Sequence, residues 1–111
     1  MSLLINDGFT LDGLIQATPG LHEAVRFKYR PALPERVAAY FLEKSSATAK
    51  PLAAEIKLLK EQMVEWDASD GTTPLPLDDR IFRRVYYPAL QVLVQHVIGY
   101  SATDWTNREG N

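Results

Sequence analysis

Side chains capable of acid–base or metal chemistry are few and widely spaced in this sequence. It contains two histidines, His22 and His96, and no cysteine. Neither histidine has a histidine, cysteine or carboxylate at the spacing of a metal site or a catalytic triad. The lack of cysteine also excludes disulfides, thiolate metal ligands and a thiol nucleophile. We therefore expect two structural histidines in a protein that is not an enzyme and needs no cofactor.

The acidic residues of the second half resemble a metal-binding loop but fail a test of spacing. In the run DASDG, residues 67–71, the first and third calcium-ligand positions counted back from Gly71 are Trp66 and Ala68. Neither can bind calcium through its side chain. Four aspartates could still gather around an ion: Asp67, Asp70, Asp78 and Asp79. Carboxylates in a loop and at a helix start are normally caps and solvated charge, so we expect no metal site.

Two groups of basic and aromatic residues are candidate contact surfaces. The first is Arg26, Lys28 and Arg30 around Tyr29, which could touch a phosphate backbone. A formal net charge of −2 favours a solvated strand face there and argues against nucleic acid as a partner. The second group is Arg83, Arg84, Tyr86 and Tyr87. Arg and Tyr are enriched at protein interfaces, although packing at a helix end is the alternative.

Composition predicts one folded domain. The chain has 111 residues, of which 46% are apolar and 23% charged. That length allows a single modest core. We expect residues 1–100 to form one globular domain and residues 101–111 a flexible tail. An acidic residue at Asp7 interrupts the N-terminus before any run of signal-peptide length, and no apolar stretch approaches the roughly 20 residues of a membrane helix. We expect a cytosolic protein without membrane contact.

The first thirty residues read as a β-hairpin. Residues 9–16 look extended, residues 17–20 supply Pro and Gly for a turn, and residues 21–29 alternate between apolar and polar side chains. Period-two alternation is typical of a half-buried strand.

Helices are predicted for the remainder of the chain. One starts at Pro34 and runs to the pair Ser45 and Ser46, and another runs over residues 51–67. Asp78 and Asp79 open a short helical turn, and an apolar helix from Tyr87 ends at Gly99. The fold class is therefore α+β, mainly α, with an N-terminal β-hairpin followed by three to four helices.

The predicted helix over residues 51–67 carries an apolar seam at steps of four and three. The seam consists of Leu52, Ile56, Leu59, Met63 and Trp66. Either the chain's own core or a partner must cover it, and both alternatives are open.

Four segments together resemble the small tail assembly chaperones of long-tailed bacteriophages. They are FKYRPALPERVAAYFLE, MVEWD, DGTTPLPLDD and YPALQVLVQHVIGY, within residues 21–100. The resemblance implies a hairpin with a "YRP" strand end leading into helices, and a "WD" helix end and proline-rich acidic loop before a closing helix. It also implies a non-enzymatic protein in the host cytoplasm that binds the tape-measure protein and recruits tail-tube subunits.

Such a chaperone would hold amphipathic client helices in an apolar groove and self-associate through similar surfaces. Residues expected to bind partners are Leu59, Met63, Trp66, Arg83, Arg84, Tyr86 and Tyr87. The alternative is a structural virion protein, such as a head–tail joining or tail-completion protein.

Overall fold

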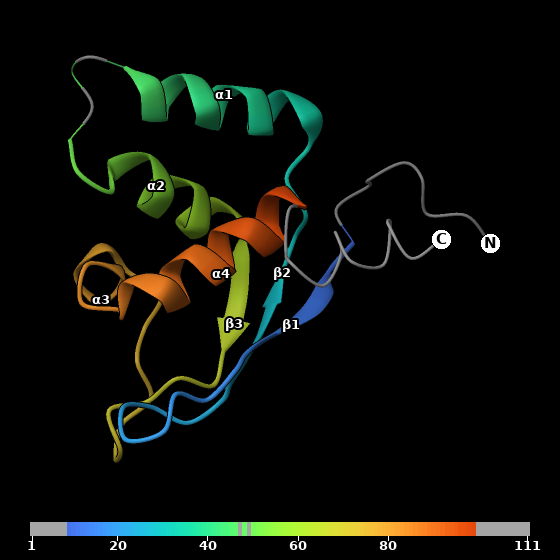
Figure 1. Ribbon diagram of the computed structural model, residues 1–111. Coiled ribbons are helices and arrows are strands. Elements are labelled where there is room, and N and C mark those ends of the chain that lie inside the picture. The colour runs from blue at the N-terminus through green and yellow to red at the C-terminus, as the bar shows by residue number, and fades with distance from the viewer. Residues whose placement is uncertain (1–8, 47, 49, 100–111) are drawn as a thin grey trace.

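The computed structural model describes residues 9–46, 48 and 50–99, which form a three-stranded antiparallel sheet and four helices (Figure 1). The elements in chain order are β1 (Leu11–Ile15), β2 (Val25–Tyr29), α1 (Pro34–Ser45), α2 (Ala53–Gln62), β3 (Met63–Trp66), α3 (Asp79–Phe82) and α4 (Tyr87–Ile98). Strand order in the sheet is β1-β2-β3. The predicted α+β class is confirmed.

The predicted hairpin is present as β1 and β2, although β2 begins at Val25 and the alternating residues 21–24 before it are not part of the strand. Leu11 pairs with Tyr29 and Ile15 with Val25, and Gly20 in the connecting turn has a φ of 80°. This left-handed conformation carries no steric penalty in glycine. Along β2 the side chains of Phe27 and Tyr29 are buried while Arg26 and Lys28, which alternate with them, are exposed, as the alternation predicted.

The prediction of one helix over residues 51–67 is wrong at its C-terminal end. Helix α2 stops at Gln62, and residues Met63–Trp66 form the third strand. The Arg30 amide donates to the Gln62 carbonyl at 2.7 Å, and the Gln62 side-chain amide donates to the Arg30 carbonyl at 2.7 Å. These contacts lead the chain from the helix onto the sheet.

A β-bulge explains why the apolar residues of this strand have the spacing of a helix. Met63 pairs with Tyr29 and Trp66 with Phe27, so three residue steps in β3 match two in β2. The extra residue turns both Met63 and Trp66 toward the core, although a regular strand would place residues three apart on opposite faces. Apolar residues three positions apart are therefore compatible with either a helix or a bulged strand. Pairing with β2 selects the strand.

The apolar seam is covered by the chain itself. Ile56, Leu59 and Met63 are buried, and Leu52 and Trp66 pack partly buried against the same core. Helix α4 contributes a buried face consisting of Ala89, Leu90, Leu93, Val94 and Val97. Of the two alternatives for the seam, the intramolecular core is the one that this structure adopts.

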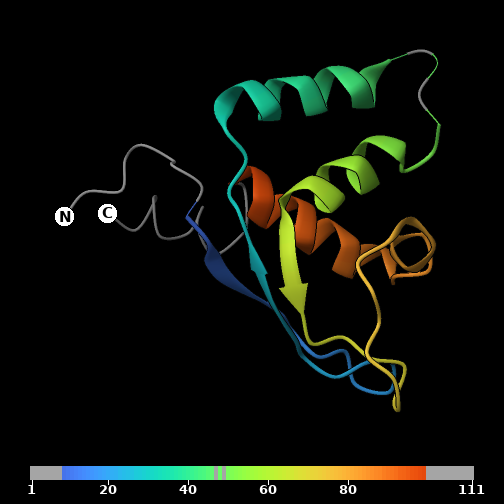
Figure 2. The same cartoon turned by 180° about the vertical axis from the view of Figure 1, so that it is seen from behind.

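Helix α1 forms the outermost layer and packs mainly on α2, as both ribbon views show (Figure 2). Charged side chains hold the pair together. Arg36 of α1 donates to Glu61 of α2 at 2.9 Å and to Glu43 at 2.9 Å. Burial opposes the charge of Arg36, but hydrogen bonds and attraction from both glutamates outweigh it and raise the pKa of the guanidinium.

The predicted starts of α1, α3 and α4 and the predicted end of α4 are confirmed, whereas α2 begins at Ala53 and not at the predicted Pro51. Pro34 lies in the first turn of α1, and the Asp78 carboxylate caps α3 by accepting from the Ile81 amide at 3.0 Å. Gly99 ends α4 with a φ of 87°. None of the helices in the described part of the chain has the length and apolar character needed to span a bilayer.

Candidate protein-binding groove

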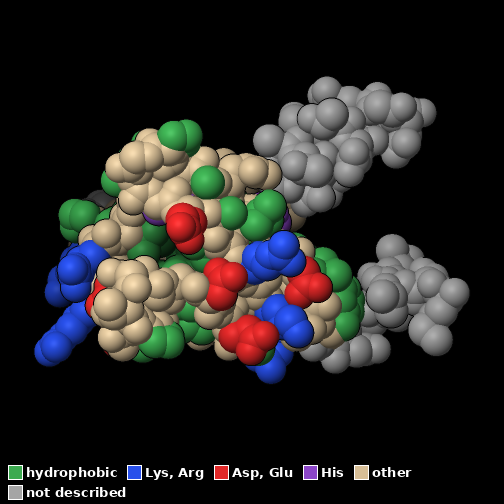
Figure 3. Space-filling view, turned by 90° about the horizontal axis from the view of Figure 1, so that it is seen from below, with side chains coloured by type: hydrophobic (Ala, Val, Ile, Leu, Met, Phe, Trp, Pro, Cys, Tyr) green, Lys and Arg blue, Asp and Glu red, His purple; other side chains and the backbone are tan. Residues whose placement is uncertain are grey.

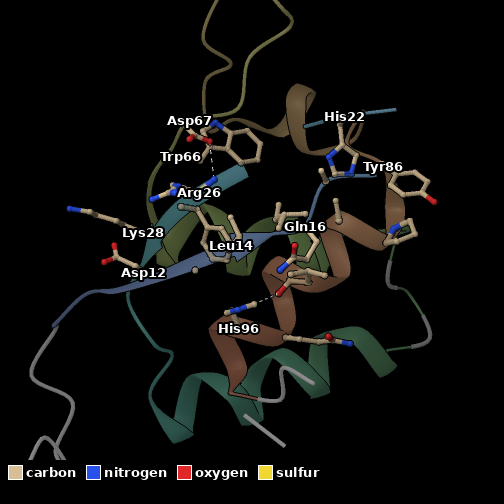
Figure 4. Close-up of a pocket in the computed structure, with 18 of the residues that line it drawn as sticks. Asp12, Leu14, Gln16, His22, Arg26, Lys28, Trp66, Asp67, Tyr86 and His96 are labelled. Atoms are coloured by element: carbon tan, nitrogen blue, oxygen red, sulfur yellow. Dashed lines mark hydrogen bonds between the residues drawn. The ribbon is translucent and has the colours of Figure 1, made fainter. Parts of the chain in front are cut away.

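A groove of about 1260 Å³ runs along the edge of the sheet, between strand β1 and helix α4 (Figure 4). This volume exceeds the roughly 300–1,000 Å³ of small-molecule pockets, and the groove is partly open to solvent. Its size and shape suit a segment of polypeptide better than a small ligand.

The floor of the groove depends on a glycine. Gly13 pairs with Phe27 across the hairpin, and a Cβ atom at position 13 would lie 2.2 Å from Cζ of that ring. Real carbon atoms do not approach so closely, so only glycine lets the Phe27 ring lie over β1. The ring is fixed from the other side by edge-to-face packing on His96, with centroids 5.2 Å apart.

Helix α4 supplies the opposite wall. The residues of α4 that line the groove are Pro88, Ala89, Val92, Gln95 and His96. Nδ1 of His96 lies 2.8 Å from the Val92 carbonyl oxygen, and because a carbonyl only accepts, Nδ1 carries the proton. The His96 ring also packs against Tyr29. His96 thus has the contacts of a structural histidine.

Tyr86 and His22 face each other at one end of the groove, with ring centroids 6.0 Å apart. Tyr86 is 46% exposed, which leaves its ring free to cover a bound segment. Trp66 also lines the groove, but its indole makes contacts within the fold. Its Nε1 donates to the Leu75 carbonyl at 2.8 Å, and its ring packs on Phe82.

The rim of the groove carries both signs of charge. Lys28 lies 3.8 Å from Glu65 on β3, and the Asp67 carboxylate accepts from the Arg26 amide at 2.9 Å. The basic strand face predicted from the sequence therefore has acidic neighbours. On the face seen in Figure 3, acidic side chains likewise lie beside Lys and Arg side chains.

The residues predicted to bind partners are dispersed by the fold. Trp66 and Tyr86 line the groove, whereas Leu59 and Met63 are 0% and 6% exposed in the core. The core residues are unavailable to a partner without unfolding, and for them the prediction of a binding role does not fit the structure. They appeared as surface candidates because periodicity identifies an apolar face but not what covers it.

The remaining predicted residues lie outside the groove. Arg83 donates to the Pro51 carbonyl at 3.3 Å. This contact corresponds to packing at a helix end, the alternative to an interface role. Arg84 is exposed. Tyr87 is 56% exposed near Tyr40. Burial raises the pKa of the Tyr40 hydroxyl, and Glu55 adds to the rise.

Three groove residues that sequence reasoning did not single out are Gly13, Leu14 and Val92. Glycine inside an alternating strand signals close approach of another group, so Gly13 could have been recognised. Leu14 and Val92 have no distinctive signal, because only the packing of α4 beside β1 brings them to one groove.

The acidic residues behave as turn and cap groups. The Asp70 carboxylate accepts from the Thr73 amide at 2.8 Å and the Thr72 amide at 3.0 Å, which lowers its pKa. Within the described residues no three His, Asp or Glu side chains gather as a metal site would require. The chain matches no protein-family model, no curated protein and no solved structure in the comparisons made.

Proposed function

We propose that this protein is a non-enzymatic tail assembly chaperone of a long-tailed bacteriophage. It binds the tape-measure protein in the host cytoplasm and recruits tail-tube subunits while the tail is built. The structural observation that supports this proposal is the open groove between β1 and α4. The sequence resemblance supplies the identity of the client.

The groove has the chemistry needed to hold an apolar segment reversibly. Pro88, Ala89 and Val92 give it an apolar wall, while Gln95 and the charged rim keep its edge polar. An amphipathic client helix can lay its apolar side on such a wall and leave its polar side in water. Exposed Tyr86 at the groove's end provides an aromatic contact of the kind common at interfaces.

The proposal is tested by co-expressing the protein with fragments of the tape-measure protein from the same phage. We expect a fragment that aggregates alone to become soluble and to co-elute with the chaperone in size-exclusion chromatography with light scattering. Tyr86→Ala should weaken the interaction about thirtyfold or more, since truncating an aromatic hot spot costs at least about 2 kcal/mol.

The matched control is Leu42→Ala on α1, which truncates a side chain that is 73% exposed and does not line the groove. It should leave fragment affinity unchanged. Substitution of Met63 would be uninformative, because Met63 belongs to the core. Equal losses in both variants, or no fragment kept soluble by the wild type, would contradict the proposal.

Mass spectrometry of purified virions separates the proposal from its alternative. A chaperone leaves before the particle is complete, so the protein should be absent. Stoichiometric presence in virions would identify a structural component, such as a head–tail joining or tail-completion protein.

A further inference from the structure

The outer edge of β1 presents backbone groups that no described strand engages. Strand β1 lies at the end of the sheet. The Arg26 amide donates to the Asp67 carboxylate, and the Arg26 carbonyl accepts from the Asp67 amide, so both peptide groups of Arg26 point away from β1. Since antiparallel ladders alternate, the groups of Val25 and Phe27 point toward β1.

The same alternation fixes the direction of the groups on β1. Gly13 and Ile15, paired with Phe27 and Val25, point back to β2. The amide and carbonyl groups of Asp12 and Leu14 therefore point outward, away from β2. An exposed edge of this kind is a template for another strand.

The two edges of the sheet differ in their protection against such pairing. Strand β3 contains the bulge opposite Lys28 and Tyr29 and carries exposed Glu65. Bulges and charges are devices that discourage edge pairing. Strand β1, with the sequence LDGLI, also carries an exposed charge, Asp12, but it has five regular pairs with β2, no bulge and no proline, and its Leu11 and Leu14 are 42% and 40% exposed.

We propose that the edge of β1 pairs antiparallel with β1 of a second copy of this chain, giving a continuous six-stranded sheet across a two-fold axis. A two-fold interface must be self-complementary. Two antiparallel copies of β1 meet this requirement, because each outward amide of one copy can donate to an outward carbonyl of the same strand in the other copy. The pairing does not depend on the proposed function.

Side chains select one register. A pairing centred on Asp12 sets two carboxylates opposite each other, which is destabilising. A pairing centred on Gly13 sets Asp12 against Leu14 and leaves two glycines without side-chain contact. Centring on Leu14 brings the exposed Leu14 side chains of the two copies together. It also places Asp12 opposite the second copy's Gln16 and Ile15 opposite the second copy's Gly13. The Leu14-centred register is the one we assign.

The first test is the mass of the protein alone, by light scattering at about 10 µM to about 1 mM. We expect the wild type to rise from the mass of one chain, 12.5 kDa, toward twice that value. Leu14→Pro removes an outward amide hydrogen without removing a bond to β2, so it should remain monomeric. Leu14→Lys, which places a charge on the edge and keeps the amide, should also remain monomeric.

The register is tested by disulfide trapping, because the chain has no cysteine of its own. Opposed residues in a hydrogen-bonded antiparallel pair have Cα atoms about 5.5 Å apart, within the range that a disulfide bridges. Leu14→Cys should therefore cross-link about tenfold faster than the control Leu42→Cys on exposed α1.

A wild type that stays monomeric throughout, or equal cross-linking of both cysteine variants, would overturn the proposal. Folding of each variant is checked by circular dichroism. If Leu14→Pro does not fold, Leu14→Lys and the cysteine pair still decide the question. Neither experiment contains a client, so their failure leaves the proposed function standing, and failure of the client experiments leaves the pairing standing.

Discussion

Replacing Gly13 by alanine should destabilise the protein because of one specific collision. The new Cβ would lie 2.2, 2.5 and 2.9 Å from three atoms of the Phe27 ring, whereas ordinary contact begins near 3.4 Å. The ring would have to retreat by more than an ångström. It is 2% exposed, with Tyr29 at 5.6 Å and His96 at 5.2 Å between centroids, so nearby rings oppose this movement.

The magnitude follows from two opposing effects. Overpacking a well-filled core costs about 1–3 kcal/mol. Replacing glycine by alanine also restricts the unfolded chain, which stabilises the native state by about 0.4–1 kcal/mol. The net loss in the free energy of unfolding should be about 1–2 kcal/mol, and each kcal/mol lowers the Tm of a domain this size by about 4–8 °C.

Urea unfolding followed by circular dichroism measures this loss, and a double-mutant cycle identifies its cause. Phe27→Leu removes the ring from the path of the new methyl group at the cost of some buried area. If the collision is responsible, adding Gly13→Ala to Phe27→Leu should cost about 1 kcal/mol less than adding it to the wild type. Additive losses would refute the explanation, and an unchanged Tm for Gly13→Ala would refute the packing itself.

Three further changes test contacts elsewhere in the fold. Trp66→Phe removes the hydrogen bond to Leu75 and should lower the free energy of unfolding by about 1 kcal/mol in urea, whereas an unchanged midpoint would mean that water replaces the bond. The ion pair of Asp79 with Lys60, at 2.7 Å, lowers the pKa of Asp79, so its stabilisation is present above the ordinary value of 3.8 and is lost as the pH falls through the lower folded value. Asp79→Asn should make the acid loss of stability shallower in pH-dependent melts, and an identical pH profile would contradict this. Arg36→Met should cost about 1 kcal/mol and speed amide hydrogen exchange in α1 more than in α2, because it removes the Arg36–Glu61 ion pair that joins the two helices and the Arg36–Glu43 ion pair within α1.

The identity of most elements followed from local chemistry. Alternation over residues 21–29, proline at the start of α1 and α4, the Asp78 cap and Gly99 each act within a few residues of their own position. Such signals are independent of the remaining fold. They therefore placed the hairpin and three of the four helices with their approximate boundaries.

The site was less accessible to sequence reasoning. Tyr86 and Trp66 were selected as aromatic interface candidates, and both line the groove. Leu59 and Met63 were selected for their periodicity, which is equally the pattern of a core face. The groove itself could not be inferred, because β1 and α4 are more than seventy residues apart and only packing through the core brings them together.

By itself, the sequence determined which segments form secondary structure, that one face of β2 is apolar, and that no thiol or clustered histidine chemistry is available. Tertiary structure decided two matters that local patterns leave open. It converted Met63–Trp66 from the predicted end of a helix into a bulged strand, because β2 offered unpaired backbone groups and space in the core for Met63 and Trp66. It also left β1 at the edge of the sheet, because strand order depends on long-range pairing that no local pattern encodes.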